Sequence, residues 1–453
     1  MHTQPFQAIV LAAGKGTRMK SAVPKVLHRV AGLSMLGHVL KLAQTAGCDA
    51  PVVVVGPAMD DVAHEASRHA PKSQVFVQVE QRGTADAVLA ARTAIAAHQG
   101  DTIVLYADTP LIRSETIARL KEALDAGAAV AVLGFYAADP SGYGRLITAN
   151  DGALLAIRED KEASEIERTI TLCNSGVLAF RCPDLLAILD GIGNNNAKGE
   201  FYLTDAVEKT RERGLPAAVV ICTENEVLGV NARDQLAAAE AIWQRRRRSS
   251  VMAEGATLIA PETVWFSHDT VVGRDVVIEP NVFFGPGVTV EDGAEIKANC
   301  HIEGARIGNA ARIGPFARLR PGADLGAGVH IGNFVEVKNV TVAAGAKANH
   351  LAYLGDGTVG AKANIGAGTI FCNYDGFNKS KTEIGAGAFI GSNSSLVAPL
   401  KIGAGAFVGS GSVITKDVPA NALALERSAQ DMREGWAEKF RSMMSKRKAS
   451  KQA

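Results

Sequence analysis

The stretch VVGRDVVIEPNVFFGPGVTVEDGAEIKANCHI, residues 271–302, decides the fold of the C-terminal half of the chain. A large apolar residue returns at every sixth position, at Val272, Ile278, Phe284, Val290, Ile296 and Ile302. The spacing slips once to five, continues from Ile307 to Val337, and returns after a break from Ile384 to Ile414. Three such hexads make one turn of a parallel β-helix with the apolar anchor inward. Because a single hexad cannot bury its apolar side alone, we expect the whole region to stack as one β-helix.

The first half of the chain has a different pattern. Short apolar runs at residues 7–11, 51–55, 74–77, 102–106, 129–135 and 217–220 read as strands. Helical patterns fall between them, at residues 24–30, 35–45, 84–97 and 114–126. This alternation predicts an α/β domain with a doubly wound, Rossmann-like and mainly parallel sheet. The loops at the carboxyl edge of such a sheet are where a ligand binds.

Two domains with a helix between them account for the 453 residues of the chain. We expect the α/β domain over residues 1–231, a linker helix over residues 232–252 and the β-helix with a C-terminal tail over residues 253–453. The linker contains the run RDQLAAAEAIWQRRRRSS, which has high helix propensity and no Gly or Pro. The tail after Lys416 ends in a basic segment.

Charge and cysteine usage exclude several classes of protein. The 48 basic residues are balanced by 47 acidic ones, so no field of the whole chain favours nucleic acid or a membrane. The one basic run, Arg245–Arg248, reads as a solvated helix end. No apolar run is long enough to span a bilayer, and no signal sequence opens the chain. The 6 cysteines are scattered without a CxxC, which indicates reduced thiols and a cytoplasmic location.

A glycine-rich loop follows the first predicted strand, in the sequence LAAGKGTRMKSAVPK at residues 11–25. Gly14 and Gly16 would let backbone N–H groups close on phosphate oxygens, where a side chain would obstruct them. Arg18 and Lys25 add cations that suit a triphosphate. The loop matches neither the P-loop pattern nor the dinucleotide pattern GxGxxG.

The whole fifteen-residue stretch resembles the signature of sugar nucleotidyltransferases, and later motifs continue the resemblance. These include QRGT at residues 81–84, YADTPL at 106–111 and GYGR at 142–145. The resemblance implies catalytic roles for Arg18 and Lys25. It also implies a set of UTP and nucleotide-sugar ligands, namely Leu11, Ala12, Ala13, Gly14, Lys25, Gln78, Gly83, Thr84, Tyr106, Asp108, Gly144, Glu159, Asn174 and Asn231.

The chemistry that this family performs is nucleotidyl transfer. A sugar 1-phosphate attacks the α-phosphorus of a nucleoside triphosphate and expels pyrophosphate. Because the attacking phosphate is already anionic, positioning and charge neutralisation suffice without a protein base. Mg²⁺ suits such a site because it takes a few hard oxygen ligands together with substrate phosphates. By resemblance, Asp108 and Asn231 supply the ligands; a helix or turn cap is the simpler interpretation of each residue taken alone.

A break in the hexads marks a second candidate site. NHLAY at residues 349–353 and CNYDGFNKSKTE at residues 372–383 are polar insertions that a plain β-helix does not need. Polar loops on a rigid solenoid commonly carry its function. His350 is a candidate general base, because an imidazole accepts a proton near neutral pH. A solvated corner residue is the alternative interpretation of His350 alone.

The motifs around the break resemble one family closely, over almost the whole chain. It is the bacterial bifunctional family with N-acetylglucosamine-1-phosphate uridyltransferase and glucosamine-1-phosphate acetyltransferase activities, whose second domain is a left-handed β-helix. The resemblance implies that His350 deprotonates the glucosamine amine. It implies glucosamine 1-phosphate ligands at Arg320, Lys338, Tyr353 and Asn364. It implies acetyl-CoA ligands at Ala367, Asn373, Tyr374, Ser392, Ser410 and Arg427.

Further expectations come from the same resemblance. The co-substrates are acetyl-CoA and UTP, the cofactor is Mg²⁺, and the product UDP-N-acetylglucosamine supplies peptidoglycan and lipopolysaccharide synthesis. The acetyl sites form between subunits of a homotrimer. Two alternatives stay open at this point. One is a single-activity pyrophosphorylase whose β-helix serves only assembly or regulation, and the other is a non-catalytic regulatory subunit built on the same folds.

Overall fold

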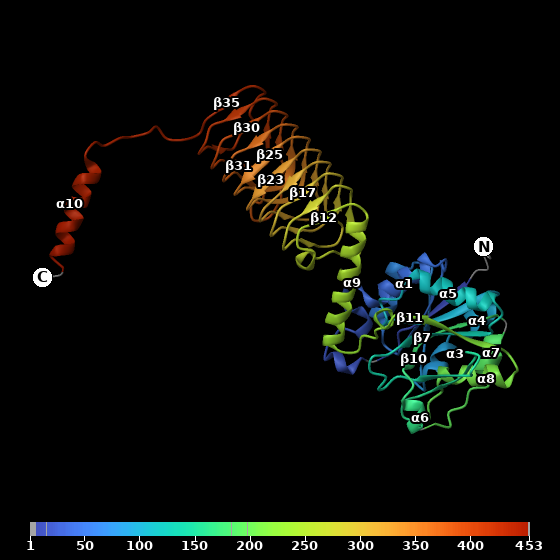
Figure 1. Cartoon of the computed structure of the whole chain (residues 1–453). Helices are drawn as coiled ribbons and strands as arrows, with labels where there is room; N and C mark the ends of the chain where they lie inside the picture. The colour runs from blue at the N-terminus through green and yellow to red at the C-terminus, as the bar shows by residue number, and fades with distance from the viewer. Residues whose placement is uncertain (1–5, 15, 183, 197, 452–453) are drawn as a thin grey trace. The chain divides into compact units, whose positions relative to one another are not determined.

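The computed structural model describes residues 6–14, 16–182, 184–196 and 198–451. The chain divides into two compact units, Met1–Ser250 with Phe266–His268, and Val251–Trp265 with Asp269–Ala453 (Figure 1). No helix among the described residues is long and apolar enough to cross a membrane.

The N-terminal unit is built on a mixed sheet. Its strands run in the order β11-β7-β10-β6-β1-β4-β5, with a β8–β9 hairpin attached to β10. Their bounds are β1 Phe6–Leu11, β4 Val52–Val55, β5 Gln74–Val77, β6 Asp101–Tyr106, β7 Val130–Tyr136, β8 Arg145–Thr148, β9 Leu154–Arg158, β10 Leu172–Phe180 and β11 Ala217–Cys222. A small separate hairpin joins β2 Arg29–Val30 to β3 Leu33–Ser34. The predicted α/β class is confirmed.

Helices cover both faces of this sheet. They are α1 Met35–Thr45, α2 Asp60–His69, α3 Thr84–Leu89, α4 Arg92–Ala97, α5 Ser114–Asp125, α6 Glu165–Arg168, α7 Asp184–Leu189 and α8 Ala206–Glu212. The long helix α9 Arg233–Ala253 packs instead in a separate small cluster with Val30, Met35 and Leu111. Short 3-10 turns are η1 Thr17–Met19, η2 Lys25–Leu27, η3 Leu203–Asp205 and η4 Glu224–Glu226. The helix predicted over residues 24–30 is wrong, because only η2 forms there before His28 turns extended and the chain enters β2.

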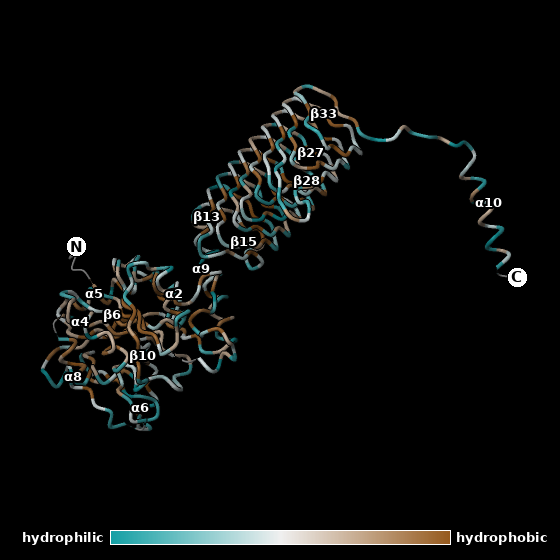
Figure 2. Tube along the Cα trace, turned by 180° about the vertical axis from the view of Figure 1, so that it is seen from behind, coloured by the Kyte–Doolittle hydropathy of each residue, from teal (hydrophilic) through white to brown (hydrophobic). Residues whose placement is uncertain are grey.

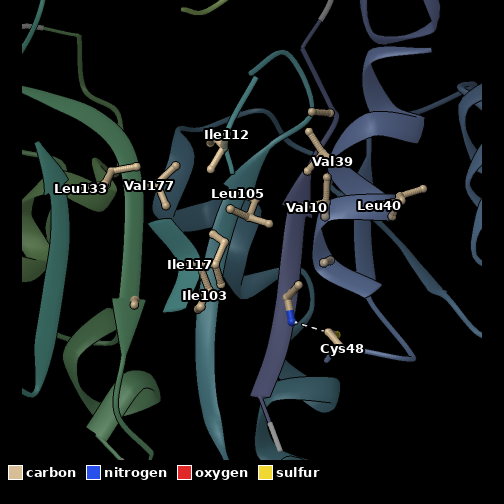
Figure 3. Close-up of a cluster of buried hydrophobic side chains, with 14 of the residues drawn as sticks. Val10, Val39, Leu40, Cys48, Ile103, Leu105, Ile112, Ile117, Leu133 and Val177 are labelled. Carbon is tan, nitrogen blue, oxygen red and sulfur yellow. Dashed lines mark hydrogen bonds between the residues drawn. The ribbon is translucent and has the colours of Figure 1, made fainter. Parts of the chain in front are cut away.

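Alternate residues of β1 enter two separate cores. Ala8 and Val10 point to the side that α1, α2 and α5 cover, and Figure 3 shows Val10 there beside Val39 of α1 and Leu105 of β6. Ile9 and Leu11 point to the opposite core. Burial on both faces explains why the central strands read as continuous apolar runs rather than alternating ones. The hydropathy colouring of Figure 2 is accordingly brown through strands such as β6.

The C-terminal unit is a parallel β-helix with three columns of short strands. One column holds β12 Thr257–Leu258, β14 Val277–Ile278, β17 Glu295–Ile296, β20 Arg312–Ile313, β23 His330–Asn333, β25 Lys347–His350, β27 Asn364–Ile365, β30 Phe389–Ile390, β33 Phe407–Val408 and β35 Leu423–Ala424. The second holds β13 Val271–Val272, β16 Thr289–Val290, β19 Ala305–Ile307, β22 Ala323–Leu325, β29 Thr382–Ile384 and β32 Leu400–Ile402. The third holds β15 Phe283–Phe284, β18 His301–Ile302, β21 Arg318–Leu319, β28 Ile370–Cys372, β31 Ser395–Val397 and β34 Val413–Ile414.

The hexad anchors decide the register of these columns. Val277 pairs with Glu295, eighteen residues on, which is three hexads per coil. Thr289 pairs with Arg306 only seventeen residues on, as the predicted one-residue slip requires, and a later coil of seventeen residues pairs Ala323 with Val340. The long strands β24 Glu336–Val342 and β26 Tyr353–Val359 bend across the second and third columns. The expected left-handed β-helix of hexapeptide repeats is confirmed.

The insertion at the break lengthens one coil. Asn364 pairs with Phe389, twenty-five residues on, because the segment from Asn373 to Lys381 loops out between β28 and β29. After the last coil the tail carries α10 Trp436–Ala449, all of whose residues are exposed. A short turn, η5 Pro261–Thr263, lies in the first coil.

Two candidate active sites

A cavity of about 350 Å³ lies at the carboxyl ends of β1 and β6 in the N-terminal unit. Leu11 and Tyr106 are register partners at the ends of these two parallel strands, so the loops that follow them meet. The cavity is lined by ten of the predicted nucleotide ligands, namely Leu11, Ala12, Ala13, Gly14, Lys25, Gln78, Gly83, Thr84, Tyr106 and Asp108. It also contains Gln81 of the QRGT motif, and three residues that the sequence did not single out, namely Val26, Ala87 and Glu200.

Lys25 joins three distant segments at the floor of this cavity. Its ammonium nitrogen is 2.5 Å from Asp108 Oδ2 and 2.9 Å from Asn231 Oδ1. The side chains of Lys25 and Asp108 are largely buried. Gly16 has φ +60, and a Cβ there would lie 2.4 Å from the Cβ of Lys25, so the glycine permits this close approach. The geometry brings the two predicted metal ligands to a single cation position.

The Asp108–Asn231 pair fits a hard divalent cation. The Lys25 ammonium group donates to both oxygens, which shows that they can face the same positive charge. Among the described residues no group of three or more His, Cys, Asp or Glu side chains could hold a metal ion. Two protein oxygens with the balance from phosphates and water match the preference of Mg²⁺ rather than that of zinc.

The second wall of the cavity depends on Gly83. Its φ is +125, and a Cβ there would lie 2.4 Å from the carbonyl oxygen of Phe201. Gln78 Nε2 donates to Gly83 O at 3.0 Å, and the Thr84 hydroxyl accepts from Leu203 N at 2.9 Å. These bonds hold the QRGT motif against residues 201–203. Gln81 Nε2 donates to Ala13 O at 2.6 Å and ties the motif to the glycine loop.

Tyr106 and Glu159 lie in environments that favour their uncharged forms. Burial, and then the charge of Asp108, raises the pKa of the Tyr106 hydroxyl. Burial raises the pKa of the Glu159 carboxyl, although the Thr204 hydroxyl donates to it at 3.1 Å. Asn174 N donates to Gly144 O at 2.7 Å, which places these two predicted residues side by side. Of the predicted ligands described, Gly144, Glu159, Asn174 and Asn231 lie outside the cavity lining, and Arg18 is exposed on η1.

The second candidate site follows one stack of corners along the β-helix. Backbone bonds link successive coils there, from Leu351 N to Asn333 O, Gly368 N to His350 O, Asn393 N to Ala367 O and Gly411 N to Ser392 O. Arg427 Nη1 then donates to Ser410 O at 3.0 Å. The structure therefore brings His350, Ala367, Ser392, Ser410 and Arg427 into one row, although 77 residues separate the first from the last.

His350 is exposed at the end of β25 and has a defined partner. Its Nδ1 lies 2.8 Å from Asn333 Oδ1. Because a carboxamide oxygen can only accept, Nδ1–H donates, which leaves Nε2 of the neutral ring with a free lone pair. Asn333 was not singled out from the sequence, and only its position opposite His350 in the ladder reveals it.

Cations gather beside this corner on the neighbouring column. Arg320 Nη1 donates to Glu336 Oε1 at 2.8 Å, and Glu336 pairs with Tyr353 in the ladder. The contact with Lys379, and then its charge, lowers the pKa of the Lys338 ammonium. Lys379 belongs to the inserted loop, so the insertion adds a third cation to Arg320 and Lys338. A phosphate monoester suits this cluster.

Buried Asp356 anchors the inserted loop. Its two oxygens accept from Asn339 Nδ2 at 2.7 Å and Asn373 Nδ2 at 2.5 Å. Burial, the largest single cause, acts to raise the pKa of the Asp356 carboxyl, but these two bonds together with the charges of Lys338 and Lys379 outweigh it and lower the pKa. Tyr374 is exposed at the start of the loop, and Asn364 is half-buried at the start of β27. Asp356 was missed in the sequence because it lies inside a strand pattern.

Comparisons with known proteins match the two halves of the chain to different families. The MobA-like NTP transferase domain matches residues 8–171, and the bacterial transferase hexapeptide (six repeats) matches residues 269–304, 304–339 and 381–416. A bifunctional protein GlmU of Azorhizobium caulinodans is 60% identical over 448 residues, covering 99% of this chain and 100% of the relative. The bifunctional protein GlmU of Xanthobacter autotrophicus is 58% identical with the same coverage, and that of Bradyrhizobium sp. is 58% identical over 96% of both chains.

Proposed function

The chain belongs to the GlmU family of bifunctional proteins, and we propose that its nucleotide cavity and its corner stack each perform one of the two activities. The protein is a bifunctional transferase. It transfers acetyl from acetyl-CoA to glucosamine 1-phosphate, then uridylyl from UTP to N-acetylglucosamine 1-phosphate, and supplies cell-wall synthesis. The contacts of Lys25 with Asp108 and Asn231, beside a cavity that Lys25, Asp108 and the predicted loops line, carry the assignment of the uridylyl site.

The uridylyl site works by holding the sugar phosphate and the nucleoside triphosphate in position for the phosphate to attack the α-phosphorus. The glycine loop and the QRGT motif bind the nucleotide, while Lys25 and Arg18 neutralise the triphosphate. The phosphate of the sugar attacks the α-phosphorus, the new P–O bond forms, and the bond to pyrophosphate breaks with its electron pair. Gly144, Glu159 and Asn174 hold the sugar hydroxyls, for which a carboxyl of raised pKa suits hydrogen bonding. Mg²⁺, held by Asp108 and Asn231, supplies further charge neutralisation when bound.

The acetyl site uses His350 as general base. Its Nε2 takes a proton from the ammonium of the sugar, and the free amine attacks the thioester carbonyl. The C–N bond forms, the C–S bond breaks with its electron pair, and the second proton of the amine passes to the thiolate, so that CoA leaves as the thiol. Arg320, Lys338 and Lys379 hold the sugar phosphate, and Tyr353, Asn364, Asn373 and Tyr374 border the sugar and acetyl group. Ala367, Ser392, Ser410 and Arg427 form a row that contacts the coenzyme.

The hexapeptide repeats indicate an oligomer. We infer a homotrimer in which each acetyl site lies between two β-helices. Phe316 and Phe334 support this, because they stack at 5.2 Å between ring centroids and yet are 48% and 56% exposed in the single chain. Light scattering should give three times the mass of one chain. Because UTP and acetyl-CoA are substrates of cytoplasmic metabolism, we place the enzyme in the cytoplasm.

Product analysis tests the proposal. The purified protein is given glucosamine 1-phosphate, acetyl-CoA, UTP and Mg²⁺, and we expect CoA thiol together with UDP-N-acetylglucosamine. If a nucleotide sugar forms only from pre-acetylated sugar phosphate, the β-helix is a scaffold and the role of His350 is refuted. If CoA is released without a nucleotide sugar, the assignment of the cavity fails.

A further inference from the structure

The basic run Arg245–Arg248 on α9 has a structural role that the two reactions do not use. The expectation that it is a solvated helix end holds for exposed Arg245 and is wrong for Arg246. Arg246 is half-buried, and its Nη1 donates to Leu111 O at 2.6 Å. Trp243 of α9 packs against the same core cluster as Leu111, so this face of the helix is fixed to the N-terminal unit.

Arg246 and Arg247 form one side of a cavity of about 370 Å³. Lys41 of α1 and Arg113, at the start of α5, bring the number of lining cations to four. The lining contains no Asp or Glu, although the whole chain has 48 basic and 47 acidic residues. In size the cavity equals the candidate nucleotide cavity of about 350 Å³. All its lining residues belong to the N-terminal unit.

Two of these cations, Arg113 and Arg246, oppose each other. Burial, and then the charge of Arg113, lowers the pKa of the Arg246 guanidinium, and only Glu226 acts in the other direction. Positive charges that line one concave cavity repel each other, which raises the free energy of the empty cavity. A bound anion reduces this repulsion. The remaining walls are apolar or neutral: Leu111, Ile112 and Trp243, whose ring meets that of His38 edge-on at 6.3 Å. Burial lowers the pKa of His38 to about 4, so this imidazole is uncharged at neutral pH.

We propose that the cavity between α1, the start of α5 and α9 binds a small phosphate-bearing anion of the size of pyrophosphate to a mononucleotide. Guanidinium groups match phosphate oxygens in pairs, which favours phosphate over a carboxylate of equal charge. The volume admits a small molecule and excludes a folded partner. The site is separate from both active sites, and its existence does not depend on the proposed function.

The position of the site gives it a link to the uridylyl centre. Pro110, Leu111, Ile112 and Arg113 line the cavity and lie two to five residues after Asp108 in the chain. Asp108 O in turn accepts from Val230 N at 2.9 Å, next to Asn231. A bound anion therefore contacts the segment that carries the candidate magnesium ligand.

Calorimetric titration of the full-length protein with inorganic pyrophosphate tests this site. The titration is made at low salt without Mg²⁺ and in a Lys25→Ala background, which weakens binding in the nucleotide cavity. We expect one pyrophosphate per chain. Lys41→Gln with Arg113→Gln should weaken it at least about tenfold, because half of the lining charge is lost while both side chains are exposed. Fluorescence of Trp243 should change on binding in a Trp265→Phe, Trp436→Phe variant.

The matched control removes the same charge elsewhere. Lys72 and Arg245 are exposed and lie outside the cavity lining, so Lys72→Gln with Arg245→Gln should change the affinity less than about twofold. Equal weakening by the two double variants would show non-specific attraction and overturn the proposal. So would the absence of binding in the Lys25→Ala background. Neither result bears on uridylyl or acetyl transfer, which are measured separately.

Discussion

At the scale of single residues, the candidate uridylyl site depends on the small size of Gly83. Gly83→Ala would place a Cβ 2.4 Å from the carbonyl oxygen of Phe201 at a φ of +125, so the QRGT motif must shift away from residues 201–203. We expect uridylyl transfer to fall at least about tenfold, since a small misplacement of binding groups has effects of that order. Acetyl transfer should be unchanged. Gly193→Ala, where no atom lies within 4 Å of the new Cβ, should leave both activities intact.

His38 makes the stability of the N-terminal unit depend on pH. In the folded protein the His38 imidazole has a pKa of about 4, so it stays neutral until the pH falls to about 4. In the unfolded chain it has its ordinary pKa of about 6.5. As pH falls from about 6.5 to 4, the unfolded state therefore gains protons first and stability declines, by about 2 kcal/mol at pH 5. His38→Gln should remove this part of the decline. Urea unfolding at pH 7 and pH 5 measures the difference, and equal pH dependence in the two proteins would contradict it.

The sequence identified those site residues that belong to recognisable motifs. Lys25, Asp108 and Asn231 were predicted from their motifs, and the structure brings them into contact. Asn333, Asp356 and Lys379 were not, because their importance lies in the partner that a neighbouring coil presents. Once the insertion interrupts the repeat, the sequence no longer indicates which residues of neighbouring coils lie opposite one another.

At the scale of elements, the inward anchors hold the β-helix together. Ile331→Ala in β23 removes a side chain that is 0% exposed and should lower the free energy of unfolding by about 3 kcal/mol. Ile259→Ala, at a position that is 59% exposed in the same unit, should cost less than about 1 kcal/mol. Denaturant unfolding followed by circular dichroism compares the two. Equal losses would mean that the hexad anchors do not carry the core.

The fold was predictable where the period is regular and less so elsewhere. The hexads determine three columns of strands, and the first seventeen-residue coil follows from the slip before Ile307, whereas the later one, from Ala323 to Val340, was not predicted. The mixed character of the first sheet was not predicted, because β10 carries Asn174, Ser175 and Gly176 at its centre and reads as a loop. It pairs antiparallel to both β6 and β7, which the order of the chain does not indicate. The helix expected over residues 84–97 divides into α3 and α4 around Ala91.

At the scale of the whole molecule, one chain carries two chemistries that need different surroundings. We propose that uridylyl transfer uses the cavity at the sheet edge of the N-terminal unit, and that acetyl transfer uses exposed His350 at a β-helix corner of the C-terminal unit. Each proposed site lies within one of the two compact units. The central claim is therefore that each site works without the chemistry of the other.

Assaying both half-reactions in two single variants tests that claim most directly. Asp108→Ala should reduce uridylyl transfer by about a hundredfold or more and leave release of CoA from acetyl-CoA and glucosamine 1-phosphate unchanged. His350→Ala should do the reverse, since loss of a general base costs about 10²- to 10⁴-fold. A mixture of the two variants should then make UDP-N-acetylglucosamine that neither makes alone. Loss of both activities in either folded variant would contradict two independent sites.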